Sequence, residues 1–477
     1  MNIWDRVLGW LTGHRATPPE PKAPPPIRPA PKKAPARTPT TRQSRPTPQP
    51  TPSSSQPPPA QPQPRQEVPP VIVGLDFGTH STKIMLRTRG AKQANVLVLD
   101  QRMDGYPWFA VPSLVRLYDG RLFFGRQAAE ASGGTLYRSL KVQLLRPHDG
   151  PVEQETFATG PEPDLLVACY LSWILERVRA HIVASHPHGE PRVFLNMAAP
   201  MNHFEKESLK VRYLHIIQSA WESVFGEKSF PIEQGAVLEK LRPRLQQLLK
   251  EVVPDRSSRP FAVLPETVAP IVSLSLDPRM TPGMYMIVDM GAGTTELSVN
   301  HVDERGADQK VLCYHDESVV IGGDNFEWAD SQGPQGEAET KQLIKAFRRV
   351  FATTWHTGYM KDRPNPAAHG RWRNFRVLLA GGAARRREVE RAIVDRRPFS
   401  NFPVAEERYD VAWHCPTDVI LDKSVGESGD QLALLAVAHG LSVPRQQWPE
   451  FFPPAEVEQQ KDAEVVDMPP AYWYLER

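Results

Sequence analysis

One short pattern that occurs twice, first at Asp76 and again at Asp289, most constrains what this chain of 477 residues can fold into. In each copy an apolar run, residues 71–75 or 286–288, leads into the aspartate and then into a turn rich in Gly and Thr. A second apolar run follows each turn. Small turn residues between two apolar runs are typical of a β-hairpin. The sequence therefore predicts two hairpins of the same design, each with an aspartate where its first strand ends.

Both turns contain residue types that bind phosphate. Glycines let backbone N–H groups approach an anion without a Cβ in the way, and Thr and Ser hydroxyls add donors. An aspartate at a strand end can hold Mg²⁺ through water, because magnesium gives up its hydration shell reluctantly. Two ordinary hairpin turns are the alternative, and for His80 we favour a role in filling the turn. The candidate phosphate-binding residues are Gly78, Thr79, His80 and Ser81 in the first turn and Gly291, Ala292, Gly293 and Thr294 in the second.

Residues 71–444 alternate short apolar runs with helical patterns. Runs at 193–195, 286–288 and 377–379 have the length and composition of buried strands. Residues 164–181 place apolar side chains along one side of a predicted helix. Buried strands that end in glycine-rich turns, with helices between them, indicate an α/β fold.

Charge and cysteine usage exclude several classes of protein. Lys and Arg number 57 against 55 Asp and Glu, so the folded part is not expected to bind nucleic acid. The three cysteines, Cys169, Cys313 and Cys415, have no C-x-x-C spacing, which argues against a disulfide framework or a zinc site and favours a reducing cytoplasm. No run of eighteen apolar residues predicts a membrane span, and the N-terminus lacks the features of a secretory signal.

Both ends of the chain differ in composition from its centre. Residues 1–13 place apolar side chains at helical spacing and predict a short amphipathic helix. It must dock on a protein partner or on the inner face of a membrane, or stay disordered. Residues 14–70 are Pro-rich and predict a disordered, semi-stiff spacer. Residues 445–477 form an acidic tail rich in Pro and aromatic residues, which can pack back on the core. We expect the helix, the spacer or the tail to bind an unidentified protein partner.

The two hairpin motifs resemble the first and second phosphate motifs of the actin-like ATPase superfamily, which includes the seventy-kilodalton heat-shock chaperones and the bacterial rod-shape actins. Further segments are similar to that family in the same order, namely residues 111–115, 124–128, 194–200, 264–269, 321–326, 379–383 and 436–441. The resemblance covers residues 71–444. It implies two lobes with ribonuclease H-like folds, lobe I at about 71–270 with a closing helix near 430–444, and lobe II at about 271–429.

The resemblance also implies ATP, ADP and Mg²⁺ as ligands and assigns roles to residues. Asp76 and Asp289 would order the waters of the magnesium ion, and Glu266 would position the attacking water. Lys141 lies where the chaperones have a catalytic lysine, with a solvated surface lysine as the alternative. The remaining implied contacts, toward the phosphates and the adenosine, are Gly322, Gly323, Gly381, Gly382 and Arg385. Arg385 has a solvated helix face as its alternative.

Two departures from the family pattern bear on function. The segment between Gly323 and Leu378 is short, so the outer subdomain of lobe II, which clamps adenine in relatives, is expected to be reduced. The segment between Pro200 and Glu266 is longer than expected. Too few residues follow Leu441 for the peptide-binding domain of the chaperones.

Two functions follow from these patterns. One is a slow ATPase switch, related to the chaperones but without a client domain, that regulates or recruits a partner through lobe closure and an N-terminal tether. The other is an actin-like scaffold or membrane-tethered adaptor, with or without filament formation. A pseudo-ATPase and a sugar-kinase-like enzyme are further alternatives.

Overall fold

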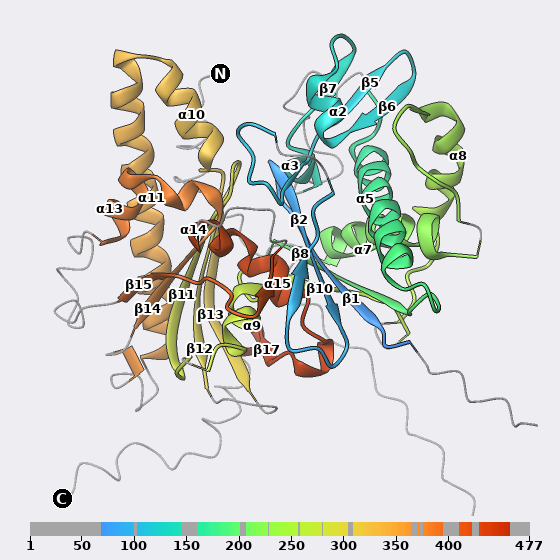
Figure 1. Ribbon diagram of the computed structural model, residues 1–477. Helices are drawn as coiled ribbons and strands as arrows, with labels where there is room; N and C mark the ends of the chain where they lie inside the picture. The colour runs from blue at the N-terminus through green and yellow to red at the C-terminus, as the bar shows by residue number, and fades with distance from the viewer. Residues whose placement is uncertain are drawn as a thin grey trace, which may run out of the picture. The chain divides into compact units, whose positions relative to one another are not determined.

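The computed structural model describes residues 68–99, 103–144, 160–200, 207–227, 229–255, 258–278, 280–303, 309–363, 371–372, 375–394, 410–421 and 429–457. All of these belong to one compact unit that begins at Val68. The predicted docking helix at 1–13, nearly all of the spacer, and tail residues 458–477 lie outside the described residues. The fold is mixed α/β with three sheets (Figure 1).

The first sheet has seven strands and contains the first predicted hairpin, β1 (Val71–Phe77) and β2 (Ser81–Thr88). Next to β1 lie β8 (Val193–Ala199) and then β10 (Phe261–Pro265), both in parallel register. Beside β2 lie β3 (Ala94–Val96) and β16 (Val419–Ile420), and β4 (Val111–Pro112) also pairs with β2. Every residue of β1 is buried, as expected for a strand with neighbours on both sides.

The second sheet repeats this arrangement around the second predicted hairpin. Its strand order is β15 (Asp410–Trp413), β14 (Arg376–Ala380), β11 (Gly283–Met290), β12 (Thr295–Val302), β13 (Lys310–Val319) and β17 (Glu450–Phe452). The hairpin strands β11 and β12 are antiparallel, whereas β14 pairs parallel to β11 and β15 parallel to β14. The order β10-β8-β1-β2-β3 in the first sheet therefore corresponds strand by strand to β15-β14-β11-β12-β13 in the second. Both predicted hairpins are confirmed.

Helices and a small third sheet accompany the first sheet. The predicted helix at 164–181 is confirmed as α5 (Pro163–Ser185), which packs against α7 (Glu207–Phe225). The third sheet joins β7 (Thr135–Tyr137), β5 (Val115–Tyr118), β6 (Arg121–Phe124) and β9 (Ala236–Val237), with α2 (Gly125–Glu130) packed against it. The long segment after Pro200 supplies α7, β9 and α8 (Leu238–Leu248), which pack against this part of the fold.

Between Gly323 and Leu378, the described residues fold mainly into two helices. These are α10 (Gly323–Ser331) and α11 (Pro334–Asp362), and α11 packs on β12 and β13. No strand occurs there before β14 within the ranges that the structure describes. This segment contributes a helical pair rather than a further sheet. α13 (Arg387–Val394) follows β14 through the short 3₁₀ helix η1 (Gly382–Arg385).

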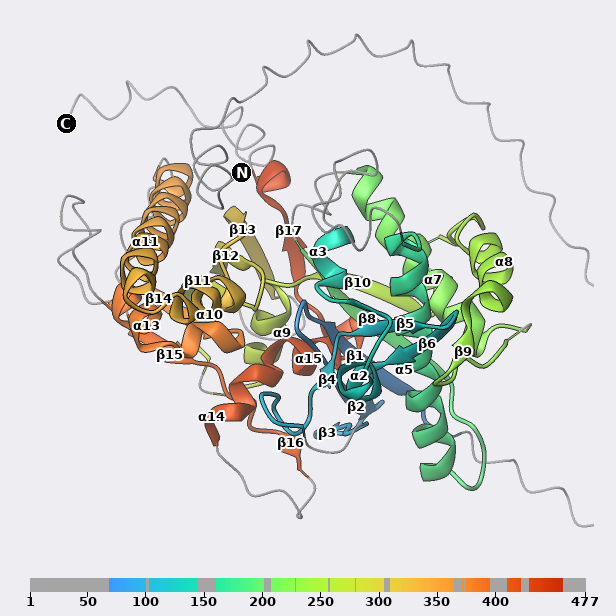
Figure 2. The same cartoon turned by 90° about the horizontal axis from the view of Figure 1, so that it is seen from above.

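Two short helices, α9 (Ala269–Ser275) and α15 (Ala436–Leu441), lie between the two large sheets in both views (Figures 1 and 2). α15 packs on β1, β2 and β8 of the first sheet and on α9. Ile271 and Leu274 of α9 join the core of the second sheet, whereas Val272 packs with Leu441 of α15. Both helices are thus shared between the two halves of the fold. α14 (Gly429–Leu432) and the 3₁₀ helix η3 (Ala433–Leu435) lead into α15, and η4 (Arg445–Gln447) follows it.

The acidic tail begins with ordered structure. β17 pairs parallel with the start of β13, and Val457 is buried. This part of the tail packs back on the core. Among the helices of the described residues, none combines the length and apolar character that a membrane crossing requires.

Candidate functional site

The two hairpin turns face a common cavity of about 320 Å³. A Cβ at Gly293 would lie 3.1 Å from Thr79 Cγ2 and 3.3 Å from Val142 Cγ2, so the second turn contacts both the first turn and α3 (Leu140–Leu144). Fourteen of the residues expected at the site line the cavity: Asp76, Gly78, Thr79, His80, Ser81, Lys141, Glu266, Asp289, Gly291, Ala292, Thr294, Gly323, Gly381 and Gly382.

The two turns are closed in the same way. Gly78 donates its backbone N–H to Ser81 O at 3.2 Å, and Gly291 donates to Thr294 O at 2.8 Å. A Cβ at Gly78 would lie 2.5 Å from Ser81 O, so the first turn requires glycine for close approach of the backbone. Both turns therefore present short backbone loops to the cavity with the hydroxyls of Thr79, Ser81 and Thr294 beside them.

Two lysines and two carboxylates form ion pairs in the cavity wall. Lys83 Nζ lies 2.8 Å from Asp76 Oδ2, and Lys141 Nζ pairs with Glu266 Oε1. Lys141 and Glu266 are both buried, so Lys141 is not the solvated surface lysine of the alternative interpretation. Burial lowers the pKa of Lys141, but the negative charges of Glu266, Glu296 and Asp76 outweigh that effect and raise it. Lys141 is consequently a fixed cation at the cavity.

Negative charge exceeds positive charge among the side chains at this point. Burial, and then the negative charges of Glu266 and Asp76, raise the pKa of Asp289 to about 7. Burial and the charge of Glu266 raise the pKa of Glu296 to about 8, although Ser318 Oγ donates to Glu296 Oε1 at 3.0 Å. The pKa of Glu266 is also raised, by burial above all. Four carboxylates thus share two lysines in a buried site, and a further cation would relieve their mutual repulsion.

Magnesium fits this donor set through its waters rather than through direct coordination. Burial and the neighbouring carboxylates raise the pKa values of Asp289 and Glu296, and a divalent cation beside Asp76 and Asp289 would favour the ionised forms. Within the described ranges, no three His, Cys, Asp or Glu side chains converge closely enough to ligate a metal directly. Hydrated Mg²⁺ bound to oxygens of a phosphate ligand needs only one or two such carboxylates.

The glycines expected on the adenosine side are packed against the second turn. Gly323 N–H donates to Gly291 O at 3.0 Å, and a Cβ at Gly322 would lie 2.3 Å from Ala292 O. Gly381 has a φ of 76°, and a Cβ there would lie 2.4 Å from Asp289 Oδ1. These glycines therefore allow the backbone to pack closely against the second turn and Asp289. Gly322 and Gly293 are not among the cavity-lining residues.

His80 lines the cavity and is not merely turn filling. Its ring stacks on Tyr106 with centroids 4.3 Å apart and an interplanar angle of 12°. Burial lowers the pKa of His80, against the opposing charges of Asp324 and Glu327. His80 is therefore neutral at neutral pH and presents a hydrogen-bonding edge rather than a charge.

Arg385 differs from the expectation. Its guanidinium lies over the ring of Trp413, 5.9 Å from the centroid, and it is not among the cavity-lining residues. Arg386 lines the cavity in its place, held by Asp330 at 2.8 Å and lying 5.1 Å from the Phe326 ring centroid. The tight 3₁₀ turn of η1 rotates consecutive arginines in different directions, which the sequence alone does not reveal.

Sequence reasoning missed Lys83 and Glu296, although a signal for both existed. In the first hairpin Asp76 pairs with Lys83, and in the second Asp289 pairs with Glu296. Directly paired residues of a hairpin point to the same face of the sheet. Once each aspartate was placed in the site, its cross-strand partner had to lie there too. Asp324 and Glu327 of α10 were also missed, and they line the cavity opposite the first turn.

No protein-family model matches the chain, and no curated protein matches it.

Proposed function

We propose that this chain binds ATP with Mg²⁺ in the cavity between the two hairpin turns and hydrolyses it slowly. The observation that carries the proposal is the apposition of two equivalent turns, each glycine- and hydroxyl-rich, around a cavity with two fixed lysines. A polyphosphate needs backbone N–H groups, hydroxyls and cations in one place. This cavity supplies all three from two different sheets.

We further infer that the fold is of the two-lobed actin and heat-shock-chaperone type. The matching strand order around the two hairpins supports two lobes with equivalent sheets. The position of α9 and α15 between those sheets supports a hinge at this point. The helical pair α10 and α11 takes the place of the outer subdomain of lobe II, so the base is held by fewer contacts than in relatives.

In this proposal the protein positions the reacting groups rather than forming covalent bonds. Lys83 and Lys141 bind phosphate oxygens, and the backbone N–H groups of the two turns orient them. Glu266 accepts a hydrogen bond from the attacking water, and its pairing with Lys141 fixes its carboxylate. Mg²⁺, when bound, neutralises charge on the phosphates, and Asp76 and Asp289 hold its waters. Because Glu266 is already engaged by Lys141, we expect turnover to be slow.

Lobe closure around ATP would then act as a switch for a partner protein. A ligand shifts a conformational equilibrium only by its differential affinity for the two states. A site built half from each sheet binds ATP more tightly in the closed state, because only the closed arrangement brings both turns to the phosphates. The N-terminal region would bind the partner.

Calorimetric titration with MgATP and MgADP, and phosphate release over hours, test the proposal. We expect binding in the micromolar range and release that Glu266→Gln abolishes while binding persists. Asp255→Asn, at an exposed position away from the cavity, is the matched control and should behave as wild type. The absence of binding for both nucleotides in the wild type, with the fold intact, would refute the proposal.

A further inference from the structure

The two helices between the sheets approach each other more closely than side chains normally allow. A Cβ at Gly440 of α15 would lie 1.9 Å from Ala269 O of α9. On the other side of α15, a Cβ at Gly74 of β1 would lie 2.3 Å from Ala438 O. α15 is thus in backbone contact with α9 on one side and with the first sheet on the other. A small displacement of either helix at this crossing must therefore also displace the sheets packed against them.

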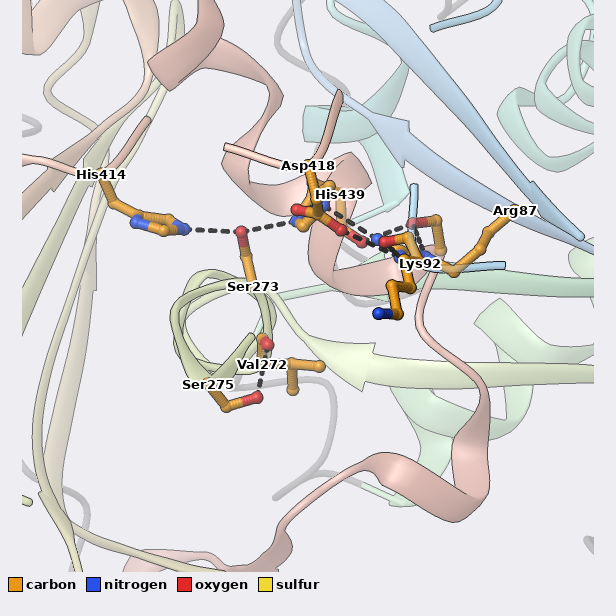
Figure 3. A network of polar contacts seen from close by, with 9 residues as sticks. Arg87, Lys92, Val272, Ser273, Ser275, His414, Asp418 and His439 are labelled. Atoms are coloured by element: carbon orange, nitrogen blue, oxygen red, sulfur yellow. Dashed lines mark hydrogen bonds and ion pairs between the residues drawn. The ribbon is translucent and has the colours of Figure 1, made fainter. Parts of the chain in front are cut away.

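A chain of polar side chains, buried except for the half-buried Asp418, runs across the same crossing (Figure 3). His414 Nε2 lies 2.6 Å from Ser273 Oγ, which lies 2.8 Å from His439 Nδ1. On its other edge, His439 Nε2 lies 2.8 Å from Asp418 Oδ1 and 2.9 Å from an Arg87 nitrogen. Asp418 and Arg87 also pair directly at 2.9 Å. The chain starts just after β15 of the second sheet, passes through α9 and α15, and ends on β2 of the first sheet.

The single hydroxyl proton of Ser273 couples the two histidines. If His439 Nδ1 carries a proton, it donates to Ser273 Oγ, and Ser273 then donates to His414 Nε2. If His439 Nδ1 is bare, it accepts from Ser273, and His414 Nε2 must be the donor. The protonation of one ring therefore fixes the hydrogen-bonding role of the other across the two sheets.

The opposite edge of His439 cannot satisfy both of its neighbours at once. A bare Nε2 accepts a hydrogen bond from Arg87, which can only donate, and leaves Asp418 without that donor. A protonated Nε2 donates to Asp418 and repels Arg87. Proton uptake by His439 thus removes the hydrogen bond from Arg87 of β2 and commits Nε2 to the carboxylate beside β16. Arg87 keeps its contacts with Asp418 and with Ser442, which caps α15.

This chain is continuous with the wall of the candidate nucleotide site. Ala433 and Leu434 of η3 and Val437 of α15 line the cavity. Val437 and His439 belong to one short helix, so a displacement of α15 at His439 moves the cavity wall with it.

We propose that Arg87, Asp418, His439, Ser273 and His414 form a proton-linked positioning relay that sets the crossing of α9 and α15 and so adjusts the affinity of the cavity for nucleotide. The regulated ligand rests on the function proposed above, whereas the relay itself rests on the contacts of Figure 3. Low pH favours the arrangement in which Arg87 no longer donates to His439, and high pH favours the arrangement observed.

The charges that face His439 determine the direction of this effect. Burial lowers the pKa of His439, Asp418 raises it and Arg87 lowers it again, with a lowered pKa as the net result. The residues of β1, β8 and α9 that face α15, namely Gly74, Asn196 and Ser273, are uncharged, and Lys92 contributes only its main-chain carbonyl, to Arg87. The observed arrangement therefore holds His439 neutral at neutral pH. An arrangement without the Arg87 contact binds the proton more tightly, so acidification populates it.

The decisive experiment measures the affinity for ADP without magnesium between pH 5.5 and 8.5 in wild type and Ser273→Ala. We expect wild-type affinity to fall at low pH relative to that of Ser273→Ala, by up to about tenfold for each unit by which the pKa of His439 differs between the two arrangements. Protonation of Asp289 and Glu296 in the cavity is common to both chains and cancels in this comparison. Ser273→Ala should match the wild type within about twofold at pH 8.5 and lack the part of the pH dependence that His439 contributes. Ser219→Ala is the matched control. Ser219 is also a buried serine in a helix, but its hydroxyl donates to the main-chain carbonyl of His215 and makes no hydrogen bond to a histidine ring among the described residues.

Two further measurements separate the possible failures. Nitrogen-15 spectra of the histidine rings in the nucleotide-free chain should show His414 and His439 changing together with pH in wild type and independently in Ser273→Ala. Independent behaviour in the wild type, or an unchanged affinity profile in Ser273→Ala, would overturn the relay. If the two histidines titrate together but the chain binds no nucleotide at any pH, the proposed function and the effect on affinity are overturned. The hydrogen-bond relay itself would then still hold. His80→Gln removes the titration of the histidine inside the cavity, and the Ser273-dependent part of the profile should survive it.

Discussion

Replacing Asp289 by asparagine should stabilise the ligand-free protein while weakening its proposed function. The carboxyl of Asp289 is buried beside Glu266 and Asp76, which raises its pKa from 3.8 to about 7. A carboxyl whose folded pKa is raised binds its proton more tightly in the folded state. Keeping it ionised therefore destabilises the fold increasingly as pH rises from about 4 to 7, with a constant cost above that.

The magnitude follows from the two pKa values. At ~1.4 kcal/mol for each unit of pKa, the difference between 3.8 and about 7 corresponds to roughly 4 kcal/mol as an upper bound. Water entry and relaxation reduce that figure, as does protonation of Glu266 and Glu296 in the same cluster. We expect Asp289→Asn to gain about 1 kcal/mol or more at pH 8.5 and close to nothing at pH 4.

Thermal unfolding of wild type and Asp289→Asn, at both pH values and with a chelator present, measures the gain. Asp255→Asn, at an exposed position, is the control, and it should leave the melting temperature nearly unchanged at both pH values. In the same variant, MgATP affinity should fall by at least about tenfold, because a carboxylate that orders magnesium waters is gone. An asparagine variant that is less stable than wild type at pH 8.5, or equally stabilised at both pH values, would refute the electrostatic reasoning.

Three further predictions test other parts of the site. Gly381→Ala should lower the free energy of unfolding in urea by about 1–3 kcal/mol, because the residue has a φ of 76° and no room for a Cβ. Gly382→Ala, with no atom within 4 Å of the added Cβ, should be close to neutral. Equal effects of the two substitutions would contradict the packing argument. Lys141→Met should lower the free energy of unfolding by about 3–5 kcal/mol, because it leaves Glu266 buried without its cation. Adding Glu266→Gln should recover part of that loss. If the effects of the two substitutions simply add, the pair does not interact. Lys83→Met should weaken ATP binding at least about tenfold in calorimetric titration, whereas Lys210→Met, at an exposed helix pair, should leave it unchanged.

Local sequence determined the two hairpins and the residues of their turns. Each turn lies between continuous apolar runs, and the close approach of Gly78 to Ser81 O requires glycine at that position. Such information is local, because backbone sterics and strand burial act within a few residues. The long helix α5 was predictable for the same reason.

Only the tertiary structure decided what those turns face and how their side chains are charged. The pKa of Asp289 depends on burial that no local pattern reveals, and on the charges of Glu266, which follows β10, and Asp76 of β1. The choice of Arg386 over Arg385 as the cavity-lining arginine depends on the tight turn of η1 and on Asp330 of α10. The chain from Arg87 to His414 joins four separate segments of the sequence, at residues 87, 273, 414–418 and 439. Electrostatic interactions and packing depend on distance in space, so the sequence specified the phosphate-binding turns and the fold specified their environment.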